Sequence, residues 1–286
     1  MNILSLFDGI SCGQLALQRA GIEVQHYHAS EINKYASIIT QKNFPNTIQL
    51  GDINQWQSWG LNNIDLIIGG SPCQGFSYAG NKLNFNDPRS TLFFTFADII
   101  SYYNPTYFLL ENVSMARRHR DIISDTLGVQ PVEINSLLVS AQNRKRFYWT
   151  NFPITMPEDK HIYLSDILEA MPSNKVYEGI VDPSYDDRPI DIDKQTLIGR
   201  GKGITFDTRA KVYSAYGKSQ TVLASQQPKI SFDRKVYRSL SVIECERLQT
   251  LPDNYTHGIS NSQRYHAIGN GWTVDVLAHI FSAIKG

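Results

Sequence analysis

The chain has 286 residues, of which 42% are hydrophobic and 19% are charged, a composition typical of a globular protein with one large domain or one domain and a smaller companion. Lys plus Arg and Asp plus Glu number 27 each, so the net charge does not indicate a polyanionic partner. The three cysteines, Cys12, Cys73 and Cys245, are isolated and odd in number. This argues against a disulfide framework and against Cys-x-x-Cys metal sites.

The sequence also indicates a cellular compartment. No apolar run approaches the ~18 residues that a membrane span requires, and the N-terminus, MNILSLFDG, leads directly into an expected strand without the features of a signal peptide. Isolated cysteines fit a reducing compartment. We therefore expect a cytoplasmic protein that does not contact a membrane.

The N-terminal segment has the pattern of a nucleotide-binding unit. A short apolar strand, Asn2–Leu6, is followed by the glycine-containing loop Phe7–Gly13 and by a helix expected over Gln14–Ala20. This order places helix-start amides next to a ligand, as in the first βαβ unit of dinucleotide-binding folds. The loop does not match GxGxxG, so by itself it is a weak indication.

Two acidic residues strengthen this interpretation. Glu31 follows a second expected strand, Val24–Ala29, about 20 residues past the loop, where a carboxylate binds a ribose diol. The alternative is that Glu31 is an acid at the start of the helix expected over Asn33–Thr40. Asp52, after a third short strand, could reach an adenine amino group from the same sheet edge.

The most informative stretch is IDLIIGGSPCQGFS. Its apolar run, Ile64–Ile68, predicts a strand buried on both faces of a parallel sheet. Cys73 follows this strand, where ligands bind in open α/β sheets, and the preceding Pro72 stiffens the backbone. Cys73 is thus either a nucleophile or a small buried apolar residue, and the stretch alone leaves both open.

The next segments add a loop and a carboxylate. The polar loop Gln74–Arg89 has a length usual for active-site lids. A helix is expected over Thr91–Tyr103 and a buried strand over Thr106–Leu110. Glu111 follows that strand at the same sheet edge as Cys73, where a carboxylate is costly unless it is paired or functional.

Two arginines lie between the next β-like segments. Val132–Ala141 reads as a strand and turn, and Phe147–Trp149 as part of a strand. Arg144 and Arg146 alternate in the intervening QNRKR, so in an extended segment they share one face. They could clamp a phosphate or a carbonyl oxygen, or they could belong to a solvated strand edge.

The composition changes from about residue 153, where prolines punctuate short polar segments. We interpret Pro157–Tyr255 as a smaller, irregular, β-rich domain, within which Arg238–Pro252 has helical spacing. Ile268–Trp272 reads as a tight turn. The amphipathic helix that follows, Thr273–Ile284, is expected to dock onto the N-terminal sheet.

Taken in order, these motifs resemble one family, the DNA (cytosine-5)-methyltransferases that use S-adenosylmethionine. LFDGISCG resembles the cofactor loop, SPCQGFS the nucleophile motif, ENV the acid motif and QNRKR the arginine motif. RSLSVIECERLQTLP and IGNGW resemble the two C-terminal motifs. The chain looks like a minimal bacterial or phage enzyme, although FDGI and the Trp after GNG are similar to the vertebrate de novo branch.

The resemblance implies an α/β fold. A Rossmann-like S-adenosylmethionine-dependent methyltransferase domain would carry a small, mainly β or irregular target-recognition domain inserted before the C-terminal segment. The implied division is 1–152 for catalysis and cofactor binding, 153–257 for target recognition, and 258–286 for a segment that completes the catalytic domain.

The implied function is methylation of C5 of cytosine in a specific duplex DNA sequence, by base flipping and covalent addition of Cys73 to C6. S-adenosyl-L-methionine would be converted to S-adenosyl-L-homocysteine. Duplex DNA is the implied partner, bound by a monomer in the cytoplasm of a bacterial or phage-infected cell, with a separate restriction endonuclease as a second candidate partner. The alternatives are an RNA cytosine-5-methyltransferase, against which the lack of a Cys-Phe-Thr motif argues, and an inactive base-flipping DNA-binding protein.

The resemblance also assigns residues, and it implies no metal site. The implied catalytic residues are Cys73, Glu111, Arg144 and Arg146, with Arg146 favoured for the cytosine O2 and Arg144 for positioning the loop and backbone. The implied cofactor-binding residues are Phe7, Asp8, Gly9, Ile10, Ser11, Glu31, Ile32, Asp52, Ile53, Pro72, Leu92, Asn270 and Trp272. The implied substrate-binding residues are Gln74, Ser77, Arg89, Asn112 and Thr221.

Overall fold

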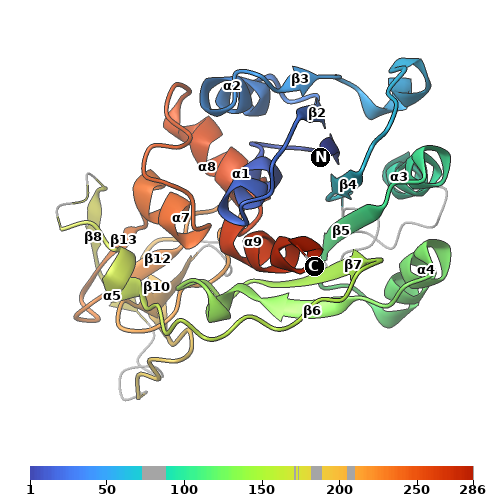
Figure 1. Cartoon of the computed structure of the whole chain (residues 1–286). Helices are drawn as coiled ribbons and strands as arrows, with labels where there is room; N and C mark the ends of the chain where they lie inside the picture. The colour runs from blue at the N-terminus through green and yellow to red at the C-terminus, as the bar shows by residue number, and fades with distance from the viewer. Residues whose placement is uncertain (73–87, 171, 173, 182–188, 205–209, 286) are drawn as a thin grey trace. The chain divides into compact units, whose positions relative to one another are not determined.

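The computed structural model describes residues 1–72, 88–170, 172, 174–181, 189–204 and 210–285 (Figure 1). The chain forms two compact units. The first comprises Met1–Ile134, Lys145–Met156 and Val274–Gly286, and the second comprises Asn135–Arg144 and Pro157–Thr273. These units group the residues differently from the three expected segments, because 135–144 and 258–273 belong to the second unit. In the parts of the chain described, no helix is long and apolar enough to cross a membrane.

A seven-stranded sheet with the order β3-β2-β1-β4-β5-β7-β6 forms the centre of the first unit. Strands β1 to β5 are parallel, and β7 runs antiparallel to β5. This confirms the expected α/β class with a mainly parallel sheet. The strands are β1 (Asn2–Leu6), β2 (His26–Ser30), β3 (Ile48–Gln49), β4 (Leu66–Gly69), β5 (Tyr107–Val113), β6 (Val132–Asn135) and β7 (Lys145–Thr150).

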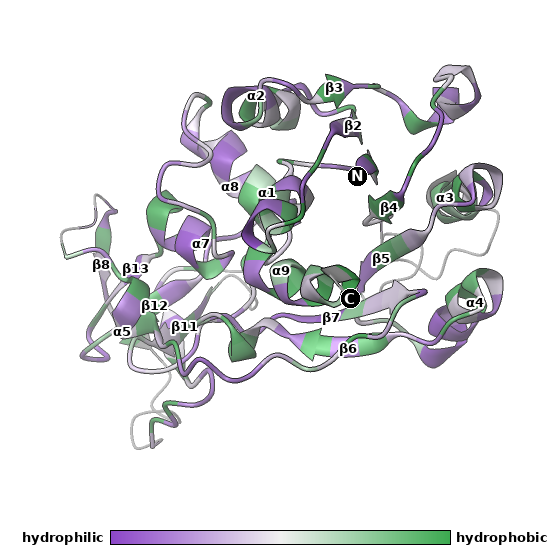
Figure 2. Ribbon diagram, in the orientation of Figure 1, coloured by the Kyte–Doolittle hydropathy of each residue, from purple (hydrophilic) through white to green (hydrophobic). Residues whose placement is uncertain are grey.

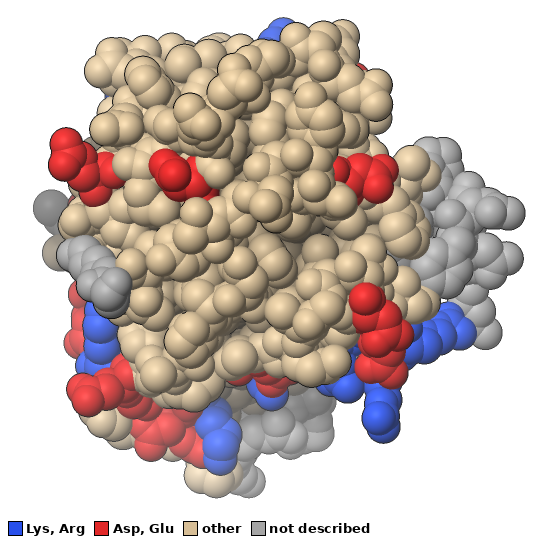
Figure 3. Space-filling model, turned by 45° about the vertical axis from the view of Figure 1, so that its right-hand side comes forward, with Lys and Arg blue, Asp and Glu red and all other residues tan. Residues whose placement is uncertain are grey.

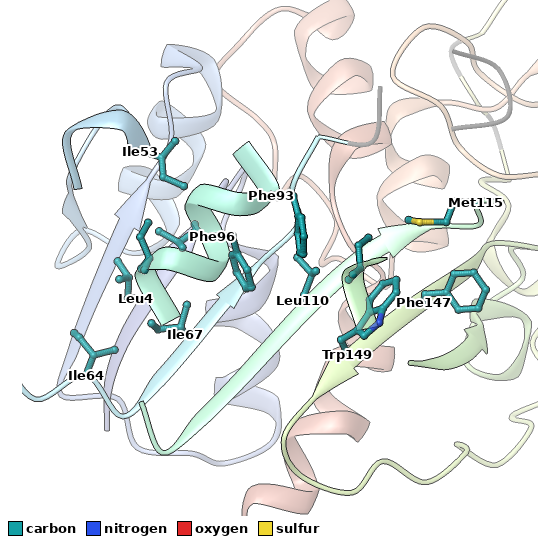
Figure 4. Packing of buried hydrophobic residues seen from close by; sticks show 13 residues of the cluster. Leu4, Ile53, Ile64, Ile67, Phe93, Phe96, Leu110, Met115, Phe147 and Trp149 are labelled. Carbon is teal, nitrogen blue, oxygen red and sulfur yellow. The ribbon is translucent and has the colours of Figure 1, made fainter. Parts of the chain in front are cut away.

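Helices alternate with these strands along the chain, as parallel connections require. They are α1 (Cys12–Arg19), α2 (Lys34–Asn43), the 3₁₀ helix η1 (Ile53–Ser58), α3 (Pro88–Tyr103), α4 (Arg117–Leu127) and α9 (Val274–Ser282). The central strands are buried on both faces, and β4 is largely hydrophobic (Figure 2). Side chains of α3, including Phe93 and Phe96, join the sheet residues and Trp149 in one core (Figure 4).

Close packing at the end of β4 requires a glycine. A Cβ at Gly69 would lie 2.7 Å from Cε2 of Phe96 and 3.0 Å from the Leu6 carbonyl oxygen. The chain therefore leaves the sheet directly beneath α3. Because β1 to β5 are parallel, the residues that follow each of them lie at one sheet edge.

The last helix is part of the first unit. α9 packs against α1, and Arg19 Nη1 lies 2.6 Å from Asp275 Oδ1 between them. Val276, Leu277, Ile280 and Phe281 are buried. The amphipathic spacing thus predicted this helix and its burial correctly.

The second unit contains a six-stranded sheet with the order β8-β13-β12-β11-β10-β9. Its strands are β8 (Val176–Glu178), β9 (Ile180–Val181), β10 (Leu197–Gly201), β11 (Lys211–Ser214), β12 (Lys229–Ser231) and β13 (Val236–Ser239). Its helices are the 3₁₀ helix η3 (Ser136–Leu138), α5 (Leu164–Ile167), α7 (Val242–Leu248) and α8 (Asn261–Asn270).

Two local predictions in this unit were wrong. Arg238 belongs to β13 rather than to a helix, because Ser241 and Glu244 form a capping box that starts α7 at Val242. Arg238 instead forms a buried bidentate pair with Glu244, at 2.7 and 2.8 Å. The expected tight turn at 268–272 is mostly helical, since α8 continues to Asn270.

Candidate active site

The loop after β1 is held in an unusual backbone conformation. Phe7 and Ser11 have φ values of 57° and 56°, which non-glycine residues adopt at a cost, and Gly9 has a φ of 60°. Asp8 anchors the loop. Its carboxylate accepts hydrogen bonds from Ser11 Oγ at 2.5 Å and from Tyr27 Oη at 2.8 Å. Burial raises the pKa of Asp8 to about 6, although these hydrogen bonds oppose the shift.

Glu31 connects this loop to the start of α2. Its Oε2 accepts a hydrogen bond from Gly9 N at 2.8 Å, and its Oε1 accepts one from Asn33 N at 2.7 Å. Asn33, not Glu31, caps the helix, because Asn33 Oδ1 accepts from the N–H groups of residues 35 and 36. Glu31 therefore binds the main chain just before α2 but does not itself cap the helix.

The neighbouring residues differ in exposure. Ile10 is buried, with 1% of its surface exposed, whereas Ile32 is 79% exposed beside Glu31. Asp52 starts η1 and accepts a hydrogen bond from Asn54 N at 2.9 Å, and Ile53 is buried. Ser30, at the end of β2, donates a hydrogen bond to the Gly51 carbonyl oxygen at 2.8 Å. The ends of β1, β2 and β3 are thus linked at one edge.

The segment after β4 is held at Ser71. Asn112 Nδ2 lies 3.3 Å from both the carbonyl oxygen and Oγ of Ser71 and donates to them, so the end of β5 holds the residues that precede Cys73. Cys73, Gln74 and Ser77 lie outside the described residues.

Two predicted residues lie on the helix that follows. Arg89 is in the first turn of α3, but its side chain lies outside the described part. Leu92, one turn further along the same helix, is partly buried against the core. The predicted cofactor residue Leu92 therefore also has a packing role.

Glu111 and Arg146 form a pair at the end of β5. The side chain of Glu111 is 9% exposed and that of Arg146 13%, and Arg146 Nε lies 2.9 Å from Glu111 Oε1. The register explains the pairing. Val113 is opposite Arg146, so Glu111 and Arg146 are diagonal neighbours on one face of the sheet. The carboxylate predicted at this sheet edge is paired, as its burial requires.

Arg144 has different partners, all within the second unit. Its Nη1 donates to the Val222 carbonyl oxygen at 3.1 Å, and its Nη2 donates to the carbonyl oxygens of Gly269 and Gly271 at 3.3 and 2.9 Å. Arg144 is 3% exposed. The idea that Arg144 and Arg146 form one clamp is therefore wrong, because their guanidinium groups bind separate partners.

The remaining predicted residues also lie in the second unit. Thr221 Oγ1 donates a hydrogen bond to the Asn143 carbonyl oxygen at 2.6 Å, which is a structural contact. Asn270 is exposed at the end of α8, whereas Trp272 is 7% exposed. A Cβ at Gly269 would lie 2.2 Å from Ala224 N, so this turn of α8 packs directly on the main chain.

Sequence reasoning missed two positioning residues. Tyr27 holds Asp8, and its place on the second strand gave no indication of that contact. Gln249 Nε2 donates to the carbonyl oxygens of Ile268 and Gly271 at 2.9 and 3.0 Å, supporting the same segment as Arg144. Gln249 lies in the motif ERLQTLP, which is the signal that could have found it.

The other cysteines are poor candidates for a nucleophile. Cys12 is 2% exposed and Cys245 is fully buried. Burial, with Glu244 and Glu246 close by, raises the pKa of Cys245, so its thiol stays protonated. Among the described residues, no group of His, Cys, Asp and Glu could hold a metal ion.

The loop after β1, the carboxylates of Glu31 and Glu111 and the β-rich second unit are the features expected of one class of enzyme. The sequence model of the C-5 cytosine-specific DNA methylases matches residues 1–129 and 136–286, and the chain belongs to this family. It is a DNA (cytosine-5-)-methyltransferase, and the family's chemistry is S-adenosylmethionine-dependent methylation of cytosine C5 with base flipping.

Individual relatives match this chain over nearly its whole length. Type II methyltransferase M.NlaX of Neisseria lactamica is 29% identical over 99% of this chain and 96% of its own length. Type II methyltransferase M.HhaI of Haemophilus parahaemolyticus is 26% identical over 98% and 93%. The structure of a putative DNA modification methyltransferase from an Escherichia coli prophage has the same fold, with a TM-score of 0.72 at 18% identity over 100% and 98% of the two chains.

Proposed function

We propose that Cys73 is the nucleophile that activates the target cytosine. Its Sγ forms a bond to C6, and the electrons of the C5–C6 double bond make C5 nucleophilic. After C5 has gained the methyl group, loss of its proton restores the double bond and expels the thiolate. Two observations support the assignment: Asn112 donates a hydrogen bond to Ser71, two residues before Cys73, and the other two cysteines are buried.

Glu111 and Arg146 are proposed to bind the flipped base. The Glu111 carboxyl group would contact N3 and the exocyclic amine, which offsets the charge that develops when the thiolate adds. Arg146 would donate to the O2 carbonyl oxygen. Their 2.9 Å pairing supports this role, because each side chain orients the other before the base enters.

S-adenosylmethionine supplies, when bound, an electrophilic methyl group, and the residues after β1 to β3 fit it. Each Glu31 oxygen accepts one main-chain hydrogen bond and keeps a second acceptor site for a ribose hydroxyl. Ile32 leaves an exposed apolar surface at this edge, which an adenosine would cover. We propose that Asp8, Asp52 and Trp272 contribute to the same site.

We also propose that residues 153–257 choose the DNA sequence. In the second unit, Tyr216 and Phe232 are 49% and 50% exposed, and the centres of their rings lie 5.6 Å apart. They follow the neighbouring parallel strands β11 and β12 and therefore lie at one sheet edge. Exposed aromatic side chains at one edge suit contact with DNA.

We also propose where the enzyme acts and with which partner. It methylates duplex DNA as a monomer in the cytoplasm of a bacterial or phage-infected cell. A separate restriction endonuclease that cleaves the same sequence is the proposed partner. Cleavage of unmethylated but not methylated host DNA by a neighbouring gene product would test that partner.

Two experiments test the proposed function. Duplex DNA carrying tritium at cytosine C5 should release it during methylation by the wild type and not by Cys73→Ala, although Cys73→Ala should still bind S-adenosylmethionine. Full release by Cys73→Ala would refute the nucleophile. Exchange of Pro157–Lys235 for the matching segment of a relative should transfer the methylated sequence, and an unchanged sequence in an active chimera would refute that role.

A further inference from the structure

The first turn of α4 is strongly basic. Arg117, Arg118, His119 and Arg120 are consecutive in a chain whose net charge is zero. The turn contains no acidic residue, and no side chain caps it. Cations at this end of a helix oppose the macrodipole, so helix stability does not account for these residues.

Asp121, the acidic residue next to this turn, compensates its positive charge only weakly. Asp121 lies 3.6 Å from Arg117 and 3.9 Å from Arg120, and the side chains of Arg117 and Asp121 are 85% and 49% exposed. Exposed pairs of this kind contribute little, and an arginine N-terminal to its acid is the less favourable order. Most of the positive charge therefore faces solvent.

This turn comes shortly after β5, which ends two residues past Glu111, one of the residues that we propose to bind the base. The Arg120 guanidinium carbon is 5.5 Å from the centre of the Phe147 ring, and Phe147 pairs with Asn112 across β5 and β7. Phe147 is adjacent in sequence to Arg146, but its side chain lies on the opposite face of the sheet from Arg146 and Glu111. Met115, just before α4, joins the same core as Phe147 (Figure 4).

We propose that the first turn of α4 binds phosphate groups of the DNA backbone that flank the target cytosine. Guanidinium groups bind phosphate oxygens bidentately, and Arg120 is already oriented by its contact with Phe147. On the face shown in Figure 3, most of the visible Lys and Arg lie in the lower part, where Asp and Glu also gather. The proposal rests on the family's activity on duplex DNA and adds a contact surface in the first unit.

The test is the salt dependence of DNA binding. Affinity of a fluorescent 30-base-pair duplex would be measured between 50 and 200 mM KCl for the wild type, for Arg117→Gln/Arg118→Gln and for the charge-preserving Arg117→Lys/Arg118→Lys. Each lost phosphate contact makes the negative slope of log association constant against log salt concentration shallower by about 0.9. At 0.1 M salt this corresponds to a loss of affinity of roughly eightfold per contact. Lys42→Gln, at the far end of α2, is the control for loss of charge elsewhere.

For Arg117→Gln/Arg118→Gln the salt-dependence slope should become shallower by about 1.8, whereas the lysine variant and Lys42→Gln should stay close to the wild type. The melting temperature of the glutamine variant should not fall, because the removed charges opposed the helix dipole. An unchanged slope, or an equal loss in Lys42→Gln, would overturn the proposal. Covalent trapping on 5-fluorocytosine DNA at low salt reports the Cys73 chemistry separately, so failure of one assignment does not imply failure of the other.

Discussion

The buried carboxyl group of Asp8 makes the stability of the first unit depend on pH. In the folded chain burial raises its pKa from 3.8 to about 6. The folded state therefore binds this proton more tightly than the unfolded state, and stability falls as the pH rises from about 4 to about 6. Above about pH 7 the carboxyl group is ionised in both states, and its contribution no longer changes.

Asp8→Asn removes this titration. A shift of about two pKa units corresponds to roughly 3 kcal/mol. Because part of this change lies below pH 4, the variant should gain about 2.5 kcal/mol of unfolding free energy relative to the wild type between pH 4 and pH 7. Urea unfolding of both proteins at pH 4, 5, 6 and 7 measures this difference, in which the titrations of all other groups cancel.

Tyr27→Phe supplies a second test of the same reasoning. Tyr27 donates a hydrogen bond that favours the ionised carboxylate. Its removal should raise the pKa of Asp8 further and move the pH-dependent loss of stability to higher pH. A difference between the wild type and Asp8→Asn that is constant from pH 4 to pH 7 would refute the argument.

Three further predictions follow from the site. Glu111→Gln should lower kcat by about 10²–10⁴ with little change in cofactor Kd, and an equal loss of cofactor affinity would indicate a structural role. Gly269→Ala should destabilise the second unit by about 1–3 kcal/mol in denaturant unfolding, because its Cβ would overlap Ala224 N; unchanged stability would contradict that packing. Trp272→Ala should weaken S-adenosylmethionine binding by at least ~1 kcal/mol in calorimetric titration, and unaltered affinity in a folded variant would place Trp272 outside the site.

Much of the first unit could be predicted because its signals are local. The apolar runs at β1, β4 and β5 identified these three strands, for β4 with burial on both faces, and parallel order placed the residues after them at one edge. The position of Glu111 at the end of an apolar strand indicated a carboxylate that is either paired or functional, and the structure pairs it with Arg146.

The errors came from contacts that sequence spacing does not reveal. Alternation placed Arg144 and Arg146 together, but Arg144 binds a carbonyl 127 residues away. The helical spacing that begins at Arg238 concealed the end of a strand, because a capping box at Ser241 decides where α7 starts.

The most direct test of the central claim is covalent trapping on duplex DNA in which every cytosine is replaced by 5-fluorocytosine, with S-adenosylmethionine present. The fluorine at C5 cannot leave as a proton, so the enzyme stays bonded to C6 after methyl transfer. Cys245→Ala, which changes a fully buried cysteine, is the matched control. We expect a denaturation-resistant complex for the wild type and for Cys245→Ala and none for Cys73→Ala. Trapping by Cys73→Ala, or no trapping by the wild type, would contradict the role of Cys73 as the nucleophile.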